Sequence, residues 1–185
     1  MIIRWPGGKS GQDRKELVST LDLFPTFCEI AGVKAPRSLV GRSLKPIVDG
    51  KNPSWREYLF TEYHIHSAHN YYPQRTVQNK RFKLILNLMP GKVNPGYAFT
   101  NNRFFEGLME TIGSADEPIR SAYFNMERPV EYELYDLQAD PYEYSNLAGD
   151  ASHAKELARL KKELQAWREE TNDPMLNPRN VLRLK

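Results

Sequence analysis

Residues 57–88 read EYLFTEYHIHSAHNYYPQRTVQNKRFKLILNL, and the rest of the chain is best understood from this stretch outward. Its two outer segments, Glu57–Tyr63 and Gln74–Leu88, have the composition of β-strands. Aromatic and aliphatic residues suit a pleated, half-buried surface, and in the second segment Phe82, Leu84 and Leu86 alternate with Lys83, Ile85 and Asn87. The stretch therefore predicts strands on either side of a polar loop.

The loop between these strands concentrates polar and aromatic side chains. Three of the four histidines lie there, together with two adjacent tyrosines and an arginine. Rigid strands that carry such a loop are a common way to hold a polar ligand. We therefore predict a substrate-binding site made by His64, His66, Tyr71, Tyr72 and Arg75.

The individual residues leave alternatives open. His64 and His66 are two apart, so on a strand end both could face a metal, but no carboxylate or cysteine set follows at diagnostic spacing. A hydrogen bond to a polar ligand is more consistent with the pattern, and simple solvent exposure is equally so. The guanidinium of Arg75 offers a bidentate fork to carboxylate or sulfate oxygens, but an ion pair with Glu62 or Asp136 fits its position as well.

Composition narrows the class of protein. The 185 residues carry a net charge of +3 with acids and bases interspersed, which does not indicate a nucleic-acid-binding surface. Cys28 is the one cysteine, so no disulfide or cysteine metal cluster can form, and its apolar surroundings predict a buried thiol. The sequence has no long apolar span or signal-peptide pattern, so we expect no membrane insertion. No catalytic motif is self-contained in it.

The segments before the central stretch resemble the end of another domain. Ile2–Trp5 predicts a short strand that runs into a Pro-Gly-Gly turn, with no partner strand nearby in the sequence. Leu17–Gly32 predicts a helix capped by Ser19 or Asp22, and Pro36–Pro53 reads as a connecting loop. The expected apolar face of that helix consists of Phe24, Phe27, Ile30 and Ala31.

The segments after the central stretch predict two helices and a further strand. A short helix is expected over Asn102–Ile112, irregular chain pinned to the core over 117–129, and a strand over Glu131–Leu137. The clearest helix runs from Ser152 to about Thr171 and ends at Asp173-Pro174. Its apolar stripe consists of Leu157, Leu160, Leu164 and Trp167.

Several of these segments together resemble the sulfatase family. The first are IIRWPG at the start and LVSTLDLFPT from Leu17, which are similar to the end of the catalytic α/β domain of sulfatases. The others resemble the C-terminal domain, most closely that of the sulfamidase (heparan N-sulfatase) group. They are YYPQR from Tyr71, KRFKLILNL from Lys80, ELYDL from Glu133 with Asp140-Pro141 and Asn146-Leu-Ala148, and Trp167 to Pro174.

The resemblance implies an α+β fold: a small antiparallel sheet with a long C-terminal helix, preceded by the last strand and helix of an alkaline-phosphatase-like domain. It implies that residues 1–56 are a remnant of that catalytic domain and 57–185 the C-terminal domain. It further implies hydrolysis of N- or O-sulfate from glycosaminoglycan-type amino sugars, with His66 and Arg75 as substrate contacts and Tyr71 and Tyr72 behind them. Gln78-Asn79 departs from the family pattern, where Arg-Thr is frequent.

The family's reactive groups are not in this sequence. Such enzymes use a formylglycine made from a cysteine in Cys-x-Pro/Ala-x-Arg and a calcium ion held by aspartates and an asparagine, whereas Cys28 is followed by Glu29-Ile30-Ala31. We therefore expect no catalytic residue, metal ligand or cofactor in this chain, and a missing N-terminal catalytic domain as its partner.

Three further expectations follow from this interpretation. The sulfated sugar is the expected substrate, self-association through the Ile2–Trp5 segment is expected if that apolar segment is exposed, and the family suggests a periplasmic, secreted or lysosomal setting. The alternative is a non-catalytic module that binds an anionic glycan or another protein.

Overall fold

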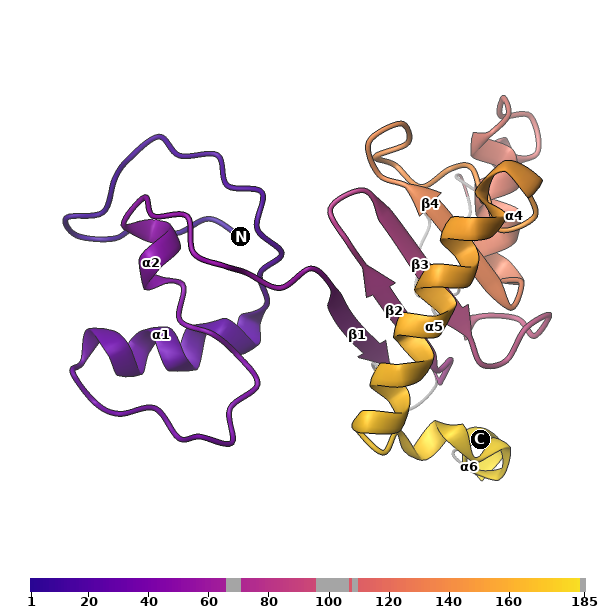
Figure 1. Ribbon diagram of the computed structural model, residues 1–185. Helices are drawn as coiled ribbons and strands as arrows, with labels where there is room; N and C mark the ends of the chain where they lie inside the picture. The colour runs from indigo at the N-terminus through magenta and orange to yellow at the C-terminus, as the bar shows by residue number, and fades with distance from the viewer. Residues whose placement is uncertain (66–70, 96–106, 108–109, 184–185) are drawn as a thin grey trace. The chain divides into compact units, whose positions relative to one another are not determined.

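The computed structural model describes residues 1–65, 71–95, 107 and 110–183. The chain divides into two compact units, Met1–Leu59 and Phe60–Lys185 (Figure 1). This division falls close to the expected boundary after residue 56. The assignment of the first unit to a catalytic α/β domain stays a prediction.

The first unit is built from short helices joined by long loops. They are the 3₁₀ turn η1 (Thr20–Asp22), helix α1 (Leu23–Ile30) and helix α2 (Lys45–Val48). Ser19 caps η1, since its side chain accepts a hydrogen bond from the Leu21 N–H. The buried apolar residues of this unit are Leu17, Leu44 and Ile47.

The first unit differs from the sequence prediction in four respects. Ile2–Trp5 forms no strand, because no other described segment pairs with it; Ile2 and Ile3 are exposed. The helix is split into η1 and α1, and the segment predicted to be a loop contains α2. The thiol of Cys28 is half-buried, not buried.

The predicted apolar face of α1 is exposed within the first unit. Phe24, Phe27 and Ile30 are exposed, whereas Pro25 and Thr26 are the buried residues of this helix. Thr26 faces inward because its hydroxyl donates to the Asp22 carbonyl (2.5 Å) and accepts from the Leu44 N–H (2.8 Å). Hydrogen bonds to the following loop thus decide which side of α1 is covered within the unit.

A four-stranded sheet forms the centre of the second unit, in the order β1-β2-β3-β4. The strands are β1 (Leu59–Tyr63), β2 (Gln74–Gln78), β3 (Phe82–Asn87) and β4 (Tyr132–Asp136). The segment Gln74–Leu88 is therefore a hairpin of two strands. β2 pairs antiparallel with β3, and β3 pairs antiparallel with β4. The predicted small antiparallel sheet is confirmed.

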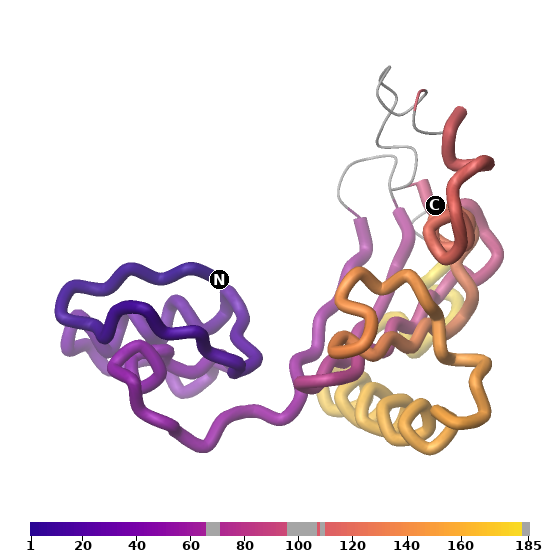
Figure 2. Tube along the Cα trace, turned by 90° about the horizontal axis from the view of Figure 1, so that it is seen from above, coloured from indigo at the N-terminus to yellow at the C-terminus, as the bar shows by residue number. Residues whose placement is uncertain are grey.

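Helix α5 (Ala154–Glu170) covers one face of this sheet, as Figures 1 and 2 show from two directions. The helix follows the 3₁₀ turn η3 (Ala151–His153), which Asp150 caps through the Ser152 N–H. Leu160 and Leu164 are buried against a row of completely buried side chains, Val77, Leu84 and Leu134, which are partners in register on β2, β3 and β4. This confirms the long C-terminal helix and most of its apolar stripe. Phe60 of β1 stacks on Trp167 at a centroid distance of 5.2 Å.

The opposite face of the sheet has a polar core. Asn87 accepts from the Gln74 side-chain amide (2.6 Å) and donates to the carboxylate of Glu133 (2.5 Å), which also accepts from the Tyr135 hydroxyl (2.5 Å). Asn87, Glu133 and Tyr135 are all buried. Because every member has a partner, this network couples β2, β3 and β4 through side chains as well as through the backbone.

The remaining elements surround the sheet. Helix α4 (Ile119–Glu127) forms where irregular chain was predicted; it buries none of its residues, and Phe124 is exposed and does not pin the segment to the core. The chain ends in the 3₁₀ turn η4 (Pro174–Leu176) and helix α6 (Pro178–Arg183). The helix predicted over 102–112 lies largely outside the described residues. None of the helices in the described ranges has the length and apolar character of a membrane span.

Candidate substrate-contact segment and its ion-pair network

Arg75 lies on β2 and its side chain is completely buried. Its Nε and Nη2 nitrogens donate to the two carboxylate oxygens of Asp173, at 2.9 and 2.6 Å, and its Nη1 donates to the Gln74 carbonyl at 2.8 Å. This is the parallel, two-bond geometry in which a guanidinium and a carboxylate interact most strongly. In this structure the fork of Arg75 is therefore occupied by a residue 98 positions further along the chain.

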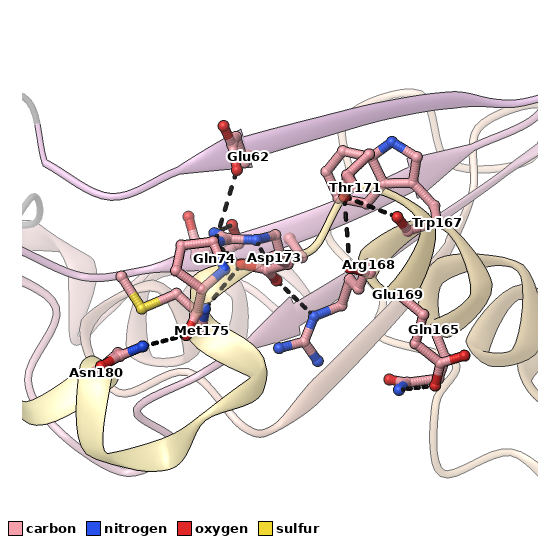
Figure 3. A network of polar contacts seen from close by, with 12 residues as sticks. Glu62, Gln74, Gln165, Trp167, Arg168, Glu169, Thr171, Asp173, Met175 and Asn180 are labelled. Carbon is pink, nitrogen blue, oxygen red and sulfur yellow. Dashed lines mark hydrogen bonds and ion pairs between the residues drawn. The ribbon is translucent and has the colours of Figure 1, made fainter.

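Asp173 follows the end of α5 and caps η4, where it accepts from the Met175 N–H. It also accepts from Nε of Arg168 at 2.7 Å, so one buried carboxylate joins two guanidinium groups (Figure 3). Burial by itself would raise the pKa of Asp173, but the hydrogen bonds from Arg75 and Arg168 and the charge of Arg75 outweigh it and lower the pKa to about 2. The carboxylate is thus ionised at all physiological pH values.

Glu62 connects this network to the candidate histidine. One carboxylate oxygen of Glu62, on β1, lies 3.7 Å from Nη2 of Arg75 and 3.9 Å from Nε2 of His64. Nε2 of His64 is itself buried and has no hydrogen-bond partner among the described residues, although a third of the side chain is exposed. A buried ring nitrogen without a partner is rare in folded proteins and marks this histidine as a polar group available to a ligand.

The two tyrosines have structural hydrogen bonds. The hydroxyl of Tyr71 donates to the Val181 carbonyl of α6 (2.8 Å), and that of Tyr72 donates to the Met89 carbonyl (2.9 Å). Burial raises the pKa of both hydroxyls; for Tyr72, burial and then the charge of Glu133 raise it to about 12. Both residues are buried, so they hold the end of the loop against the rest of the unit.

The structure thus brings His64 and Arg75 near Glu62. Tyr71 and Tyr72 lie just before β2, where their hydroxyls bond to other parts of the unit. His66 lies outside the described residues. The ion pair of Arg75 with Glu62 is present at long range, whereas Asp136 pairs with Arg81 instead, with the guanidinium Nη2 2.7 Å away. Direct substrate binding by the five predicted residues stays a prediction.

Sequence reasoning missed Asp173 and Arg168. Asp173-Pro174 carries a recognisable helix-stop signal, and an arginine in the last turn of a helix is common, so both residues have ordinary local explanations. Nothing in local spacing relates either of them to Arg75. Tertiary folding alone makes them neighbours.

The resemblance implies a calcium ion in such enzymes. Among the residues that the structure describes, no three His, Cys, Asp or Glu side chains form a group that could hold a metal ion. Asp173, the most buried acid of the network, has its oxygens taken by two arginines. The described residues do not fit a calcium site.

Comparison with known proteins agrees with this architecture. The chain is 31% identical to an ulvan-active sulfatase of Formosa agariphila over 93% of its length, and 32% identical to the N-sulphoglucosamine sulphohydrolase of Homo sapiens over 89%. A solved structure described as a 2-O GAG sulfatase superposes with a TM-score of 0.63 at 26% identity and covers 91% of the chain. The chain spans about a third of each curated relative (33% and 34%) and 29% of the solved structure.

The α+β architecture and these likenesses define the chain as the C-terminal portion of a sulfatase. Sulfatases of this kind belong to the alkaline-phosphatase-like proteins. Residues 1–93 match the family model described as "N-sulphoglucosamine sulphohydrolase, C-terminal". The chain belongs to that family.

Proposed function

We propose that this chain is the C-terminal part of a sulfatase that hydrolyses N- or O-sulfate from glycosaminoglycan-type amino sugars, and that it completes the substrate pocket. The observation that carries the proposal is the family match over residues 1–93, which includes the whole segment from His64 to Arg75. The names of the relatives support the substrate class, since one is an N-sulphoglucosamine sulphohydrolase and another a GAG sulfatase.

The proposal divides the labour among the candidate residues. His64 and His66 are the proposed substrate contacts; the Nε2 of His64, which has no partner among the described residues, can donate to a sulfate or hydroxyl oxygen. Arg75, Tyr71 and Tyr72 are proposed to hold the segment in position, since their polar groups already bond to Asp173, Val181 and Met89. On this proposal they shape the substrate subsite and do not contact the substrate through hydrogen bonds.

The reactive centre is proposed to lie on a second polypeptide portion, corresponding to the two thirds of the relatives that this chain does not match. That portion would carry the formylglycine cysteine and the calcium ligands. On this proposal the isolated chain does not release sulfate, and it becomes part of an active enzyme when joined to such a portion.

A chimera tests the proposal. The chain replaces the matching segment of the human relative, and sulfate release from N-sulfoglucosamine is measured for the chimera, for the truncated relative and for the chain alone. Activity in the chimera only supports the proposal; an inactive chimera that is folded by circular dichroism contradicts it.

Two histidine variants of the chimera test the proposed contact. We expect His64→Ala to raise KM with little change in folding, because the ring makes no hydrogen bond through Nε2 to any residue that the structure describes. His153→Ala is the matched control, since His153 lies at the start of α5 and contacts Asp150. Equal KM values in the two variants would remove His64 from the substrate subsite.

The second candidate function is a non-catalytic module that binds an anionic glycan. It is favoured by a hollow beside α5 that is lined by Lys161, Lys162 and Arg168. Glycan binding by the chain, combined with an inactive chimera, would select this function over the first.

A further inference from the structure

A hollow of about 290 Å³ lies in the second unit, and one of its lining residues, Leu86, is the register partner of Arg75. It opens between the C-terminal half of α5 and the ends of β3 and β4. Leu86 and Tyr132 form its floor; they are register partners on β3 and β4. The α5 residues that line it are Lys161, Lys162, Leu164, Gln165 and Arg168.

The side chains around this hollow are predominantly cationic. Two lysines and an arginine line it, and none of its described lining residues is acidic. Two acidic residues close to Arg168 in the sequence have other partners: Asp173 is shared between Arg75 and Arg168, and Glu169 accepts from the Gln165 amide at 2.7 Å on the exposed side of the helix. The hollow therefore has an excess of positive charge over an apolar floor.

Arg168 gives this hollow a fixed cationic group. Its Nε is held by Asp173, and the side chain is only 8% exposed. Its two terminal nitrogens make no hydrogen bond to any residue in the described ranges, and Figure 3 shows them pointing away from Asp173. A guanidinium whose one nitrogen is clamped presents its remaining donors with little loss of side-chain entropy on binding an oxyanion.

Lys161 and Lys162 complete the arrangement. The ammonium group of Lys161 lies 3.7 Å from the centre of the Tyr132 ring, a cation–π contact that keeps it at the wall of the hollow. Lys162 is exposed and has no ion-pair partner among the described residues. Lys161 is thus held at one wall of the hollow, whereas Lys162 lies at the rim and can move to meet a ligand.

We propose that this hollow binds a sulfate or carboxylate group of an anionic saccharide, as a second contact for the polyanionic substrate. The choice of an anionic saccharide as ligand rests on the proposed function. The location of the site rests on the cavity and on the positive charges of Lys161, Lys162 and Arg168 that line it. The anion would accept hydrogen bonds from the terminal nitrogens of Arg168 and from Lys162.

The experiment uses the full chain and a heparin-derived tetrasaccharide. Affinity is measured by calorimetry at about 50 mM salt, since ion pairs at an exposed rim weaken as salt screens them. We expect Lys162→Glu to weaken binding by roughly tenfold or more, because one attractive charge becomes repulsive. The control is Lys155→Glu, which makes the same charge change at an exposed position in the first turn of α5.

Each outcome decides the matter. If Lys162→Glu loses affinity for the tetrasaccharide and Lys155→Glu keeps it, the site is supported. Equal loss in both variants shows general attraction of a polyanion and overturns it, as does absence of binding by the unmodified chain. Amide chemical shifts should move at Leu86, Tyr132 and Gln165 during the titration; shifts confined to other residues also overturn the site.

The test is separable from that of the proposed function. An active chimera with a chain that does not bind the tetrasaccharide refutes this site alone. Binding at the hollow with an inactive chimera refutes the sulfatase role alone.

Discussion

The carboxylate of Asp173 closes on the guanidinium of Arg75 with two hydrogen bonds of 2.9 and 2.6 Å, although 98 residues separate the two. This contact fastens the end of α5 and the turn η4 to the second strand of the sheet. Arg168 donates to the same carboxylate, so removing one side chain leaves two buried guanidinium groups with a lost partner.

Asp173→Asn should therefore destabilise the second unit strongly. Breaking a buried ion pair from one side costs about 3–5 kcal/mol, because the remaining charge is left in a site of low polarity. The measurement is the free energy of unfolding in urea, monitored by hydrogen exchange of peptides from residues 71–95. Glu170→Gln, an exposed acid on α5, is the control and should change stability by less than about 0.5 kcal/mol. A loss below 1 kcal/mol for Asp173→Asn would show that the pair is dispensable.

The same contact predicts a dependence on pH. The pKa of Asp173 is lowered from 3.8 to about 2 in the folded state, so the stabilisation it provides is complete above the unfolded pKa. It is lost as the pH falls from 3.8 through about 2. The stability difference between the unmodified chain and Asp173→Asn should shrink by on the order of 2 kcal/mol between pH 5 and pH 2. A difference that is constant over this range would contradict the lowered pKa.

Asp22 has the corresponding role in the first unit. Its side chain is completely buried and accepts from two nitrogens of Arg56 (2.7 and 2.5 Å) and from the N–H groups of Ser19 and Arg42. Burial raises its pKa, but these hydrogen bonds, Arg56 foremost, lower it below the usual value. Asp22→Asn should cost about 3 kcal/mol because Arg56 loses its carboxylate partner.

The fluorescence of Trp55 can report this loss. Its indole N–H donates to the Leu17 carbonyl, next to the Arg56 contact, so its environment changes when the unit opens. Asp13→Asn is the matched control, because Asp13 forms an exposed pair with Lys15 and should matter little. Similar unfolding midpoints for the two variants would contradict the assigned role of Asp22.

Gly41 predicts a steric effect in the same unit. A Cβ atom at this position would lie 2.0 Å from the Leu21 carbonyl oxygen, which is backbone and cannot rotate away. Gly41→Ala should therefore destabilise the first unit by about 1–3 kcal/mol, as overpacking does. Gly149→Ala, where a Cβ meets nothing within 4 Å, is the control. Thermal unfolding of both variants, with hydrogen exchange to locate the change, provides the measurement.

Local signals in the sequence predicted the elements whose patterns repeat over many residues. The alternation in Phe82–Asn87 and the three- and four-residue spacing of Leu157, Leu160 and Leu164 specify a strand and a helix whatever surrounds them. Capping by Ser19, with Asp22 as the alternative, was likewise readable, since a cap bonds to residues two positions away. The short helices α2 and α4 were missed because their sequences carry loop signals, proline among them, that do not exclude a helix.

The sequence by itself determined the strand patterns of the sheet, the long C-terminal helix and the resemblance to sulfatases, because each depends on residues close together in the chain. The tertiary structure alone decided that Arg75 pairs with Asp173, that Phe24 and Phe27 face outward, and that Arg168 lines a cationic hollow with Tyr132. The physical reason is that side-chain periodicity records which face of an element is apolar, whereas the partner of a buried charge is chosen by the packing of distant elements.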